Sequence, residues 1–312
     1  MRTRNLRAKE PDLSLNIAGV RLRNPVIAAS GTFGYGQEYK GLLDITGLGG
    51  ICTKGLTLNP RSGNTGTRLH ETPSGLMNSI GLENIGIRAF IETELRRLRD
   101  MGPVVIANLS GGTISEYVKG ARLLDVSDVE IIELNISCPN VKAGGMAFGL
   151  DPRSAGRITR RVRRATPNTP LMVKLSPNAP DLAAIAKACV AAGADAISLV
   201  NTFKAVAIDI ERRKPVFENT SAGLSGPCIR PIALRMVWEL YDAVKVPIIG
   251  MGGIASAADA LEFLLAGAAA IQVGSATFAH PPVMNEIIAG IADYMREKGF
   301  AVLGDLSIRG TG

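Results

Sequence analysis

Aromatic, histidine and cysteine residues are all scarce in this sequence. Phe, Trp and Tyr make up 4% of its 312 residues, and there are two His and four Cys. The cysteines stand at positions 52, 138, 189 and 228, so none of them belongs to a C-x-x-C pair. This spacing argues against the usual ligand sets of structural zinc and of iron–sulfur clusters, and we expect no metal site in the chain.

Long apolar runs and sorting signals are also missing. No stretch approaches the roughly 18 apolar residues of a membrane span, and the basic start of the chain lacks the apolar core of a secretory signal. We therefore expect a cytoplasmic protein without membrane association, whose residues 1–12 form a flexible tail. No G-x-G-x-x-G motif follows an N-terminal strand, so a Rossmann-type nicotinamide site is not indicated.

Positive charge is in excess and partly clustered. The net charge is +7, and five Arg fall between positions 157 and 164. A basic patch can bind nucleic acid, but here it has no interleaved aromatic residues and no nucleic-acid-binding motif. A solvated helix face explains the cluster better, and the modest positive field would help an anionic substrate approach.

Apolar segments of strand length alternate with helical patterns along the chain. Eight candidate strands are rich in Val, Ile, Leu and Ala, as parallel strands covered on both faces should be: residues 26–29, 50–53, 104–109, 129–136, 171–175, 196–200, 247–250 and 269–273. Helical patterns cover residues 88–100, 114–124, 153–165, 181–192, 229–243 and 257–266. This alternation predicts one α/β domain over residues 1–312, a (β/α)8 TIM barrel, with its weakest helical pattern after the first strand.

Two further features surround the predicted barrel. Residues 13–22 read as a short hairpin that can plug its bottom. The connections after the second, fourth and sixth strands are long, at about residues 54–83, 138–151 and 201–227. In this topology all three emerge at the carboxyl ends of the strands, where barrels place their active sites, and loops of this length are usually functional.

The fourth strand ends in the most informative stretch, E-L-N-I-S-C-P-N at positions 133–140. Pro139 ends the strand because it cannot donate a ladder hydrogen bond, and a Gly-rich segment follows it. A thiol, Cys138, therefore stands at the carboxyl end of a strand between Asn135 and Asn140. It can be a catalytic group or an inert buried cysteine, and this strand alone does not separate the two.

The other strands also end in polar residues or glycines. These are Ser30, Lys54, Asn108, Lys174, Asn201, Thr202, Gly252, Gly253, Gly274 and Ser275. Small residues after strands seven and eight are typical of a phosphate site, although tight glycine turns would look the same. A phosphate at the rim of a flat polar pocket suggests FMN, and a lysine in the barrel mouth would neutralise a reduced flavin.

Five motifs together resemble a known family. They are N-I-S-C-P-N-V-K-A-G-G-M-A-F-G from Asn135, N-S-I-G-L from Asn78, V-K-L-S-P-N from Val173, V-N-T from Val200 and G-L-S-G-P from Gly223. From about residue 15 to residue 280 the chain resembles the class 1 dihydroorotate dehydrogenases. Class 2 enzymes have serine where this chain has Cys138, and N-V-K-A-G-G after it resembles the NAD-linked class 1B rather than the fumarate-linked class 1A.

The resemblance implies a reaction and a role for individual residues. Dihydroorotate would be oxidised to orotate in pyrimidine (UMP) biosynthesis, with Cys138 as the base and FMN as the hydride acceptor. The residues implied for the substrate are Lys54, Asn78, Ser79, Ile80, Gly81, Leu82, Asn135, Asn140, Asn201 and Thr202. Those implied for FMN are Ser30, Lys54, Gly55, Asn108, Asn135, Lys174, Val200, Gly226, Gly252, Gly253, Gly274 and Ser275.

The resemblance also implies partners. In class 1B the electrons leave through a second subunit that carries FAD and a [2Fe–2S] cluster and reduces NAD, and the catalytic chains pair as homodimers within a heterotetramer. Three alternatives stay open: a fumarate-linked class 1A enzyme, a flavin-dependent dehydrogenase of another dihydropyrimidine such as dihydrouracil, and a phosphate-binding barrel without redox chemistry. Flavin absorbance of the purified protein would exclude the last.

Overall fold

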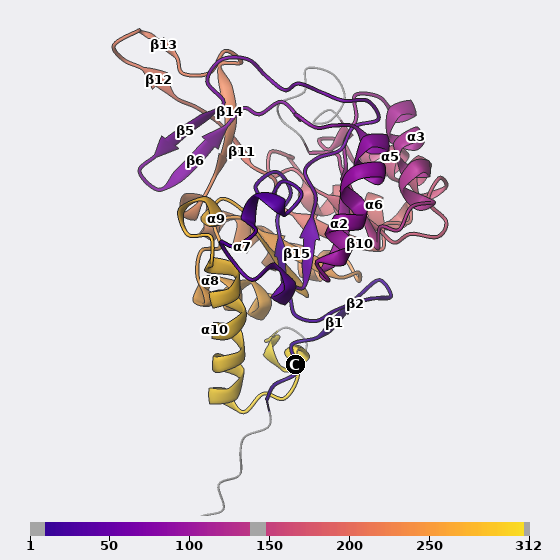
Figure 1. Cartoon of the computed structure of the whole chain (residues 1–312), viewed down its shortest axis with the longest axis vertical. Helices are drawn as coiled ribbons and strands as arrows, with labels where there is room; N and C mark the ends of the chain where they lie inside the picture. The colour runs from indigo at the N-terminus through magenta and orange to yellow at the C-terminus, as the bar shows by residue number, and fades with distance from the viewer. Residues whose placement is uncertain (1–9, 138–147, 309–312) are drawn as a thin grey trace, which may run out of the picture.

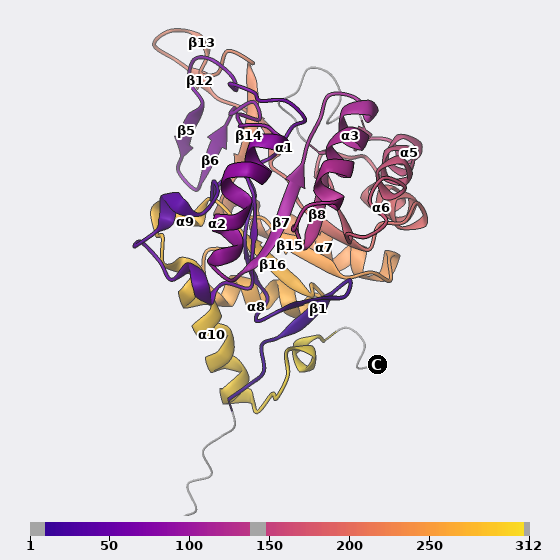
Figure 2. The same cartoon turned by 45° about the vertical axis from the view of Figure 1, so that its right-hand side comes forward.

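A closed barrel of parallel strands forms the centre of the molecule (Figures 1 and 2). The structure is a computed structural model that describes residues 10–137 and 148–308. The barrel strands are β3 (Val26–Ala28), β4 (Gly50–Cys52), β7 (Val104–Leu109), β8 (Ile131–Asn135), β9 (Leu171–Lys174), β10 (Ala196–Leu199), β15 (Ile248–Met251) and β16 (Ala270–Val273). Each pairs with the next in chain order, and β16 closes the ring on β3. The predicted (β/α)8 barrel is confirmed.

Helices cover the outside of the barrel. They are α1 (Ile87–Ala89), which continues through the π-helical η3 (Phe90–Glu94) into α2 (Leu95–Asp100), then α3 (Ile114–Asp125), α5 (Pro152–Arg163), α6 (Leu182–Ala191), α7 (Arg230–Ala243), α8 (Ala257–Leu265), α9 (Ala276–Ala279) and α10 (Val283–Lys298). Shorter 3-10 segments are η1 (Gln37–Tyr39), η2 (Ile45–Gly47), η4 (Pro227–Ile229) and η5 (Leu303–Leu306). The six predicted helical segments are confirmed, and the connection after β3 holds only η1 and η2.

Local sequence explains where these helices lie. In α3, the buried residues Tyr117, Ala121 and Leu124 recur at helical spacing. They form one face of the helix, and this face packs against the barrel. The side chain of Asp181 caps α6 by accepting a hydrogen bond from the backbone N–H of Ala184. Among the described residues, no helix has both the length and the apolar character needed to cross a membrane.

A hairpin closes the bottom of the barrel. It consists of β1 (Leu15–Ile17) and β2 (Val20–Leu22), which pair antiparallel. Ile17 and Leu22 are buried in one cluster with Ile27, Ile106 and other residues of the barrel strands. The predicted N-terminal hairpin is therefore confirmed, and it fills the amino-terminal ends of the strands with apolar side chains.

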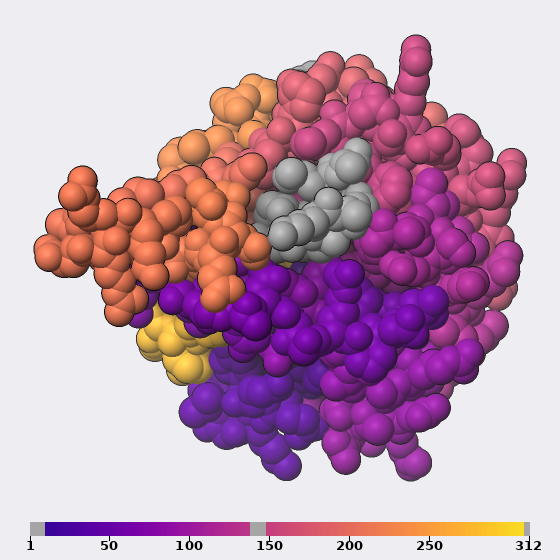
Figure 3. Space-filling model, turned by 90° about the horizontal axis from the view of Figure 1, so that it is seen from above, coloured from indigo at the N-terminus to yellow at the C-terminus, as the bar shows by residue number. Residues whose placement is uncertain are grey.

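The opposite end of the barrel carries an antiparallel sheet that the sequence analysis treated as two loops. Its strands, in spatial order, are β11 (Phe203–Val206), β14 (Ser221–Ser225), β6 (Gly75–Asn78) and β5 (Leu69–Thr72). The connections after β4 and β10 thus join through the pairing of β6 with β14. Two more strands, β12 (Ile208–Asp209) and β13 (Lys214–Pro215), extend from this sheet as an arm at the top of the molecule (Figures 1 and 3).

Candidate active site

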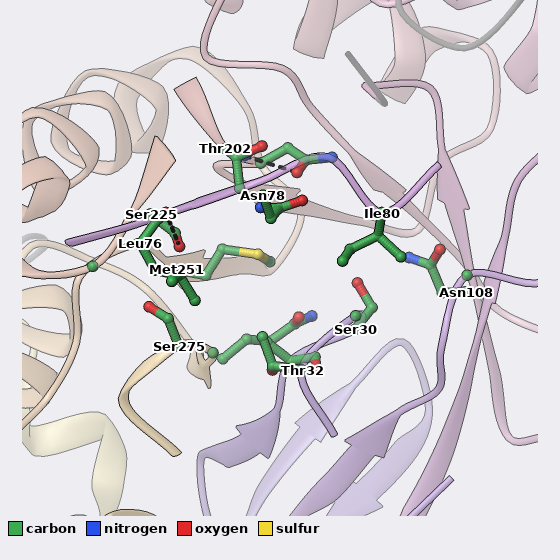
Figure 4. Close-up of a pocket in the computed structure, with 18 of the residues that line it drawn as sticks. Ser30, Thr32, Leu76, Asn78, Ile80, Asn108, Thr202, Ser225, Met251 and Ser275 are labelled. Carbon is green, nitrogen blue, oxygen red and sulfur yellow. Dashed lines mark hydrogen bonds between the residues drawn. The ribbon is translucent and has the colours of Figure 1, made fainter. Parts of the chain in front are cut away.

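A cavity of about 340 Å³ lies at the carboxyl ends of the barrel strands, beneath the antiparallel sheet. Barrel residues form one side of it and sheet residues the other. In Figure 4, Ser30, Thr32 and Ser275 lie along the lower side, Asn78 and Thr202 lie along the upper side, and the side chain of Met251 lies between them. We call the barrel side of the cavity the floor and its edge near Lys54 and Glu83 the rim.

The floor rests on a buried ion pair. Glu133 of β8 is completely buried, and Lys174 of β9 is 4% exposed. Lys174 Nζ lies 3.9 Å from Glu133 Oε2 and donates a hydrogen bond to Ser30 Oγ at 3.1 Å. Lys174 and Ser30 line the cavity, whereas Glu133 lies behind the residues that line it. The cavity therefore has a cation on its floor and a carboxylate beneath it.

Four further donors surround the carboxylate of Glu133, each from a different barrel strand. Ser198 Oγ donates to Oε1 at 2.7 Å and Gln272 Nε2 donates to Oε1 at 2.9 Å. Asn108 Nδ2 donates to Oε2 at 2.5 Å, and Cys52 Sγ donates to Oε2 at 3.1 Å. Buried polar groups need such partners, so the network satisfies a charge that would otherwise be unfavourable inside a barrel.

The protonation states in this network follow from its contacts. Burial alone would raise the pKa of Glu133, but the charge of Lys174 and the hydrogen bonds from Ser198, Gln272 and Cys52 outweigh it and lower the pKa below its ordinary value. Burial and the adjacent Glu133 raise the pKa of Cys52 well above its ordinary value. Glu133 is therefore an ionised acceptor and Cys52 a protonated donor.

A chain of amide and hydroxyl groups leads from Glu133 to the end of β8. Asn135 Nδ2 donates to Asn108 Oδ1 at 3.2 Å, and Ser137 Oγ donates to Asn135 Oδ1 at 3.0 Å. Asn201 Nδ2 in turn donates to Ser137 Oγ at 2.8 Å. Ser137 directly precedes Cys138, which lies outside the described residues, as does Asn140. Three of the amides predicted from the sequence, Asn108, Asn135 and Asn201, are thus joined in one hydrogen-bonded row, whereas Asn78 Nδ2 donates to Gly223 O at 3.2 Å.

Two glycine turns meet beside the cavity. Gly253, after β15, has φ +79°, and a Cβ built there would lie 2.8 Å from Gly226 O and 2.8 Å from Arg230 N. Gly252 has φ +123°, so both positions use backbone conformations that side chains disfavour. Because no side chain intervenes, the backbone itself faces the cavity, and such turns suit a phosphate group.

The rim carries a more open group of charges. Glu83 Oε2 lies 3.7 Å from Lys54 Nζ and accepts a hydrogen bond from the Arg68 guanidinium at 2.8 Å. The side chains of Lys54 and Glu83 are 30% and 40% exposed. The hydrogen bond from Arg68, followed by the charge of Lys54, lowers the pKa of Glu83 below its ordinary value.

Most of the predicted site residues meet at this cavity. All those predicted for FMN line it, and so do the predicted substrate residues Lys54, Asn78, Ile80, Gly81, Leu82, Asn135, Asn201 and Thr202. Ser79 does not: its side chain is buried, and its Oγ accepts from Asn64 Nδ2 at 3.0 Å and Asn219 Nδ2 at 3.2 Å.

Three polar residues of the floor were not among those predicted from the sequence. Glu133, Ser198 and Gln272 lie inside barrel strands, where we counted their segments as apolar. The available signal was a polar residue inside an otherwise apolar strand: Glu133 in β8, Ser198 in β10 and Gln272 in β16. Gln272 also lines the cavity, and its Oε1 is buried without a hydrogen-bond partner among the described residues.

Comparisons with known proteins show the family of the chain. A family model described as Dihydroorotate dehydrogenase matches residues 12–295. A protein of Petrotoga mobilis named dihydroorotate dehydrogenase B (NAD(+)), catalytic subunit, is 55% identical over 295 residues, which cover 95% of this chain and 98% of that protein. Proteins of the same name from Geotalea daltonii and Thermoanaerobacter pseudethanolicus are 53% and 52% identical, over 95% and 91% of this chain and 97% and 94% of their own. The chain therefore belongs to the dihydroorotate dehydrogenase family.

Proposed function

We propose that this chain is the FMN-binding catalytic subunit of an NAD-linked, class 1B dihydroorotate dehydrogenase, and that it oxidises dihydroorotate to orotate in pyrimidine biosynthesis. One observation carries the proposal: all the residues predicted for FMN, from Ser30 to Ser275, line a single cavity at the mouth of the barrel. The relatives' shared name, dihydroorotate dehydrogenase B, supports the reaction and the NAD linkage.

The residues of the cavity suit a flavin mononucleotide. Its volume of about 340 Å³ falls within the usual range for small-molecule sites. The amide groups of Asn108 and Asn135 and the Oε1 of Gln272, which has no partner within residues 10–137 and 148–308, supply the mixed donors and acceptors that a flat heterocycle requires. Lys174 would hold the end of the ring system that becomes negative on reduction, and the turn at Gly252 and Gly253 would hold the phosphate.

The substrate would lie between this ring and the upper side of the cavity. Dihydroorotate carries a carboxylate, and Lys54 supplies a cation beside Asn78 and Asn201. Cys138 would take a proton from one ring carbon as hydride leaves the adjacent carbon, which creates the C=C bond of orotate. A thiol has an ordinary pKa of about 8.5, so its surroundings must favour the thiolate for it to act as a base at neutral pH. When bound, FMN supplies the hydride acceptor.

The electrons would then pass to a second subunit. We propose that this partner carries FAD and a [2Fe–2S] cluster, reduces NAD, and forms a heterotetramer with a homodimer of the present chain. The name "catalytic subunit" of the relatives supports a partner of some kind. We further propose that residues 1–312 form one domain and that the protein works in the cytoplasm.

Anaerobic mixing of the purified chain with dihydroorotate tests the proposal. The protein should show flavin absorbance that bleaches on mixing, and Cys138→Ala should retain the flavin but reduce it slower by several orders of magnitude. NADH should form slowly with the chain alone and rapidly once an iron–sulfur flavoprotein partner is added. Bleaching of the Ala variant at the wild-type rate would remove Cys138 as the base, and fast fumarate reduction would reassign the chain to class 1A. A colourless protein that binds no FMN would refute the proposal.

A further inference from the structure

Glu133 is completely buried and lies outside the wall of the cavity. Its exposed fraction is 0%, and it is absent from the residues that line the cavity. Three of its partners do line the cavity, namely Lys174, Asn108 and Gln272. Glu133 would therefore not touch a bound molecule, and it can act on one only through the field of its charge and through the positions of these three side chains.

An ionised carboxylate can only accept hydrogen bonds, and this restricts the amides around it. Asn108 and Gln272 must both turn their NH2 groups toward Glu133, at 2.5 Å and 2.9 Å. Asn108 Oδ1 is then left to accept from Asn135, and Gln272 Oε1, in a side chain that lines the cavity, is left without a hydrogen-bond partner among the described residues. One carboxylate thus decides which side of each amide points away from the barrel core.

The same carboxylate offsets the charge of Lys174. The two charges lie 3.9 Å apart in surroundings that exclude water, where charges interact more strongly than at a surface. A flavin gains negative charge on reduction, so Lys174 favours the reduced form and Glu133 opposes that effect. The balance of the two charges would set how readily a bound flavin accepts and releases electrons.

We propose that Glu133 is a positioning residue of the flavin site, which fixes the amide orientations of Asn108 and Gln272 and lowers the reduction potential of bound flavin by offsetting Lys174. The inference rests on the proposed function, because it assumes that FMN occupies this cavity. A lower potential favours the release of electrons to an acceptor. A core residue that only stabilised the barrel would leave the potential of bound flavin unchanged.

The test compares three variants with the wild type by redox titration of bound flavin and by FMN titration of the apoprotein. Glu133→Gln removes the charge and puts an NH2 group among side chains that all donate hydrogen bonds to this position. Ser198→Ala is the matched control, since it removes one hydrogen bond to Glu133 but keeps the charge. The double variant Glu133→Gln with Gln272→Glu restores one carboxylate to the network, now at position 272 on β16.

Glu133→Gln should bind FMN more weakly and shift the equilibrium for two-electron flavin reduction at least tenfold toward the reduced form, which is about 30 mV. Ser198→Ala should change that equilibrium less than threefold. The double variant should recover FMN binding, with a potential no higher than that of the wild type, because its carboxylate now lines the cavity.

An unchanged potential in flavin-loaded Glu133→Gln would overturn the inference, and so would an equal rise in the single and double variants. If Glu133→Gln holds no FMN, recovery of FMN in the double variant supports the inference and its failure to recover overturns it. The wild type separates the two proposals: a wild type without flavin defeats the proposed function, whereas a normal wild type with an unaltered Glu133→Gln defeats only the role of Glu133.

Discussion

Two lysine–glutamate pairs border the cavity at nearly the same separation but in different surroundings. On the floor, Lys174 and Glu133 lie 3.9 Å apart, with side chains 5% and 0% exposed. At the rim, Lys54 and Glu83 lie 3.7 Å apart, with side chains 30% and 40% exposed. Distance alone would rank the pairs as equals, so the comparison shows what burial adds to an ion pair.

The two ion pairs differ in strength because they differ in their access to water. The floor pair is almost completely buried, so each charge depends on its partner and on the surrounding hydrogen bonds, and losing one partner leaves an unpaired buried charge. The rim pair is partly hydrated, contributes about 1 kcal/mol or less, and can separate when another anion reaches Lys54. The floor is thus a fixed part of the barrel, while the rim can exchange Glu83 for a ligand carboxylate.

Removal of the lysine from each pair gives the largest expected contrast. Lys174→Met should lower the free energy of unfolding of the apoprotein by about 3 to 5 kcal/mol, because Glu133 stays buried without its cation. Lys54→Met, its matched control at the rim, should cost no more than about 1 kcal/mol. Denaturant unfolding of both apoproteins measures the difference, and equal losses would show that the two pairs do not differ as their burial suggests.

A second contrast opposes a crowded glycine to an open one. Gly253 and Gly31 line the same cavity and have φ values of +79° and +83°, but a Cβ at Gly31 would meet nothing within 4 Å. Gly253→Ala should therefore destabilise the protein by about 1 to 3 kcal/mol more than Gly31→Ala, since it adds a clash with backbone to the same strain. Thermal unfolding and FMN content check this, and equal behaviour of the two variants would argue against a tight turn.

The barrel and the lining residues at its strand ends could be predicted because both follow from local patterns, whereas other lining residues, such as Asn78 and Gly226, were implied by the family resemblance. Continuous apolar strands reveal a parallel barrel, and parallel strands bring their carboxyl ends together, so Ser30 and Ser275 meet although they are far apart in the chain. No knowledge of side-chain contacts is needed for this step.

The antiparallel sheet and the floor network depend on contacts that no local pattern records. Asn78 pairs with Gly223 across a large sequence separation, and the four strands involved are short. Glu133 was counted within an apolar run because one charged residue hardly changes the average of a buried strand. Its role became visible only once Lys174 and Gln272, from other strands, were seen to converge on it.

The next expected contrast is in how the contributions of Glu133 and Glu83 to stability depend on pH. The pKa of Glu133 is lowered in the folded protein, so its ionisation stabilises the fold above the unfolded pKa of about 4.3 and ceases to do so as pH falls through the lower folded pKa. Protonated Glu133 resembles Gln in shape. The difference in free energy of unfolding between wild type and Glu133→Gln should therefore shrink on acidification below that pH, by at most about 1.4 kcal/mol per pH unit.

Glu83 provides the control for this titration. Its pKa is also lowered, but at a hydrated rim, so the difference between wild type and Glu83→Gln should be small at neutral pH and should fall further with added salt. Denaturant unfolding across pH, at low and high salt, compares the two variants. A difference for Glu133→Gln that does not change with pH would mean that Glu133 is not ionised in the fold.

The smallest effect is expected from Glu83→Gln in the holoenzyme. The substitution releases Lys54 and Arg68 from their shared carboxylate and makes the cavity mouth more positive. Dihydroorotate is an anion, so its KM should fall by about two- to fivefold with little change in kcat, and the gain should disappear at high salt because exposed charges are screened. Glu71→Gln, on β5 away from the cavity lining, removes the same charge and should leave KM unchanged. A rise in KM for Glu83→Gln would show instead that Glu83 holds Lys54 in the position that substrate requires. The rim pair would then be a fixed ion pair, like the pair on the floor.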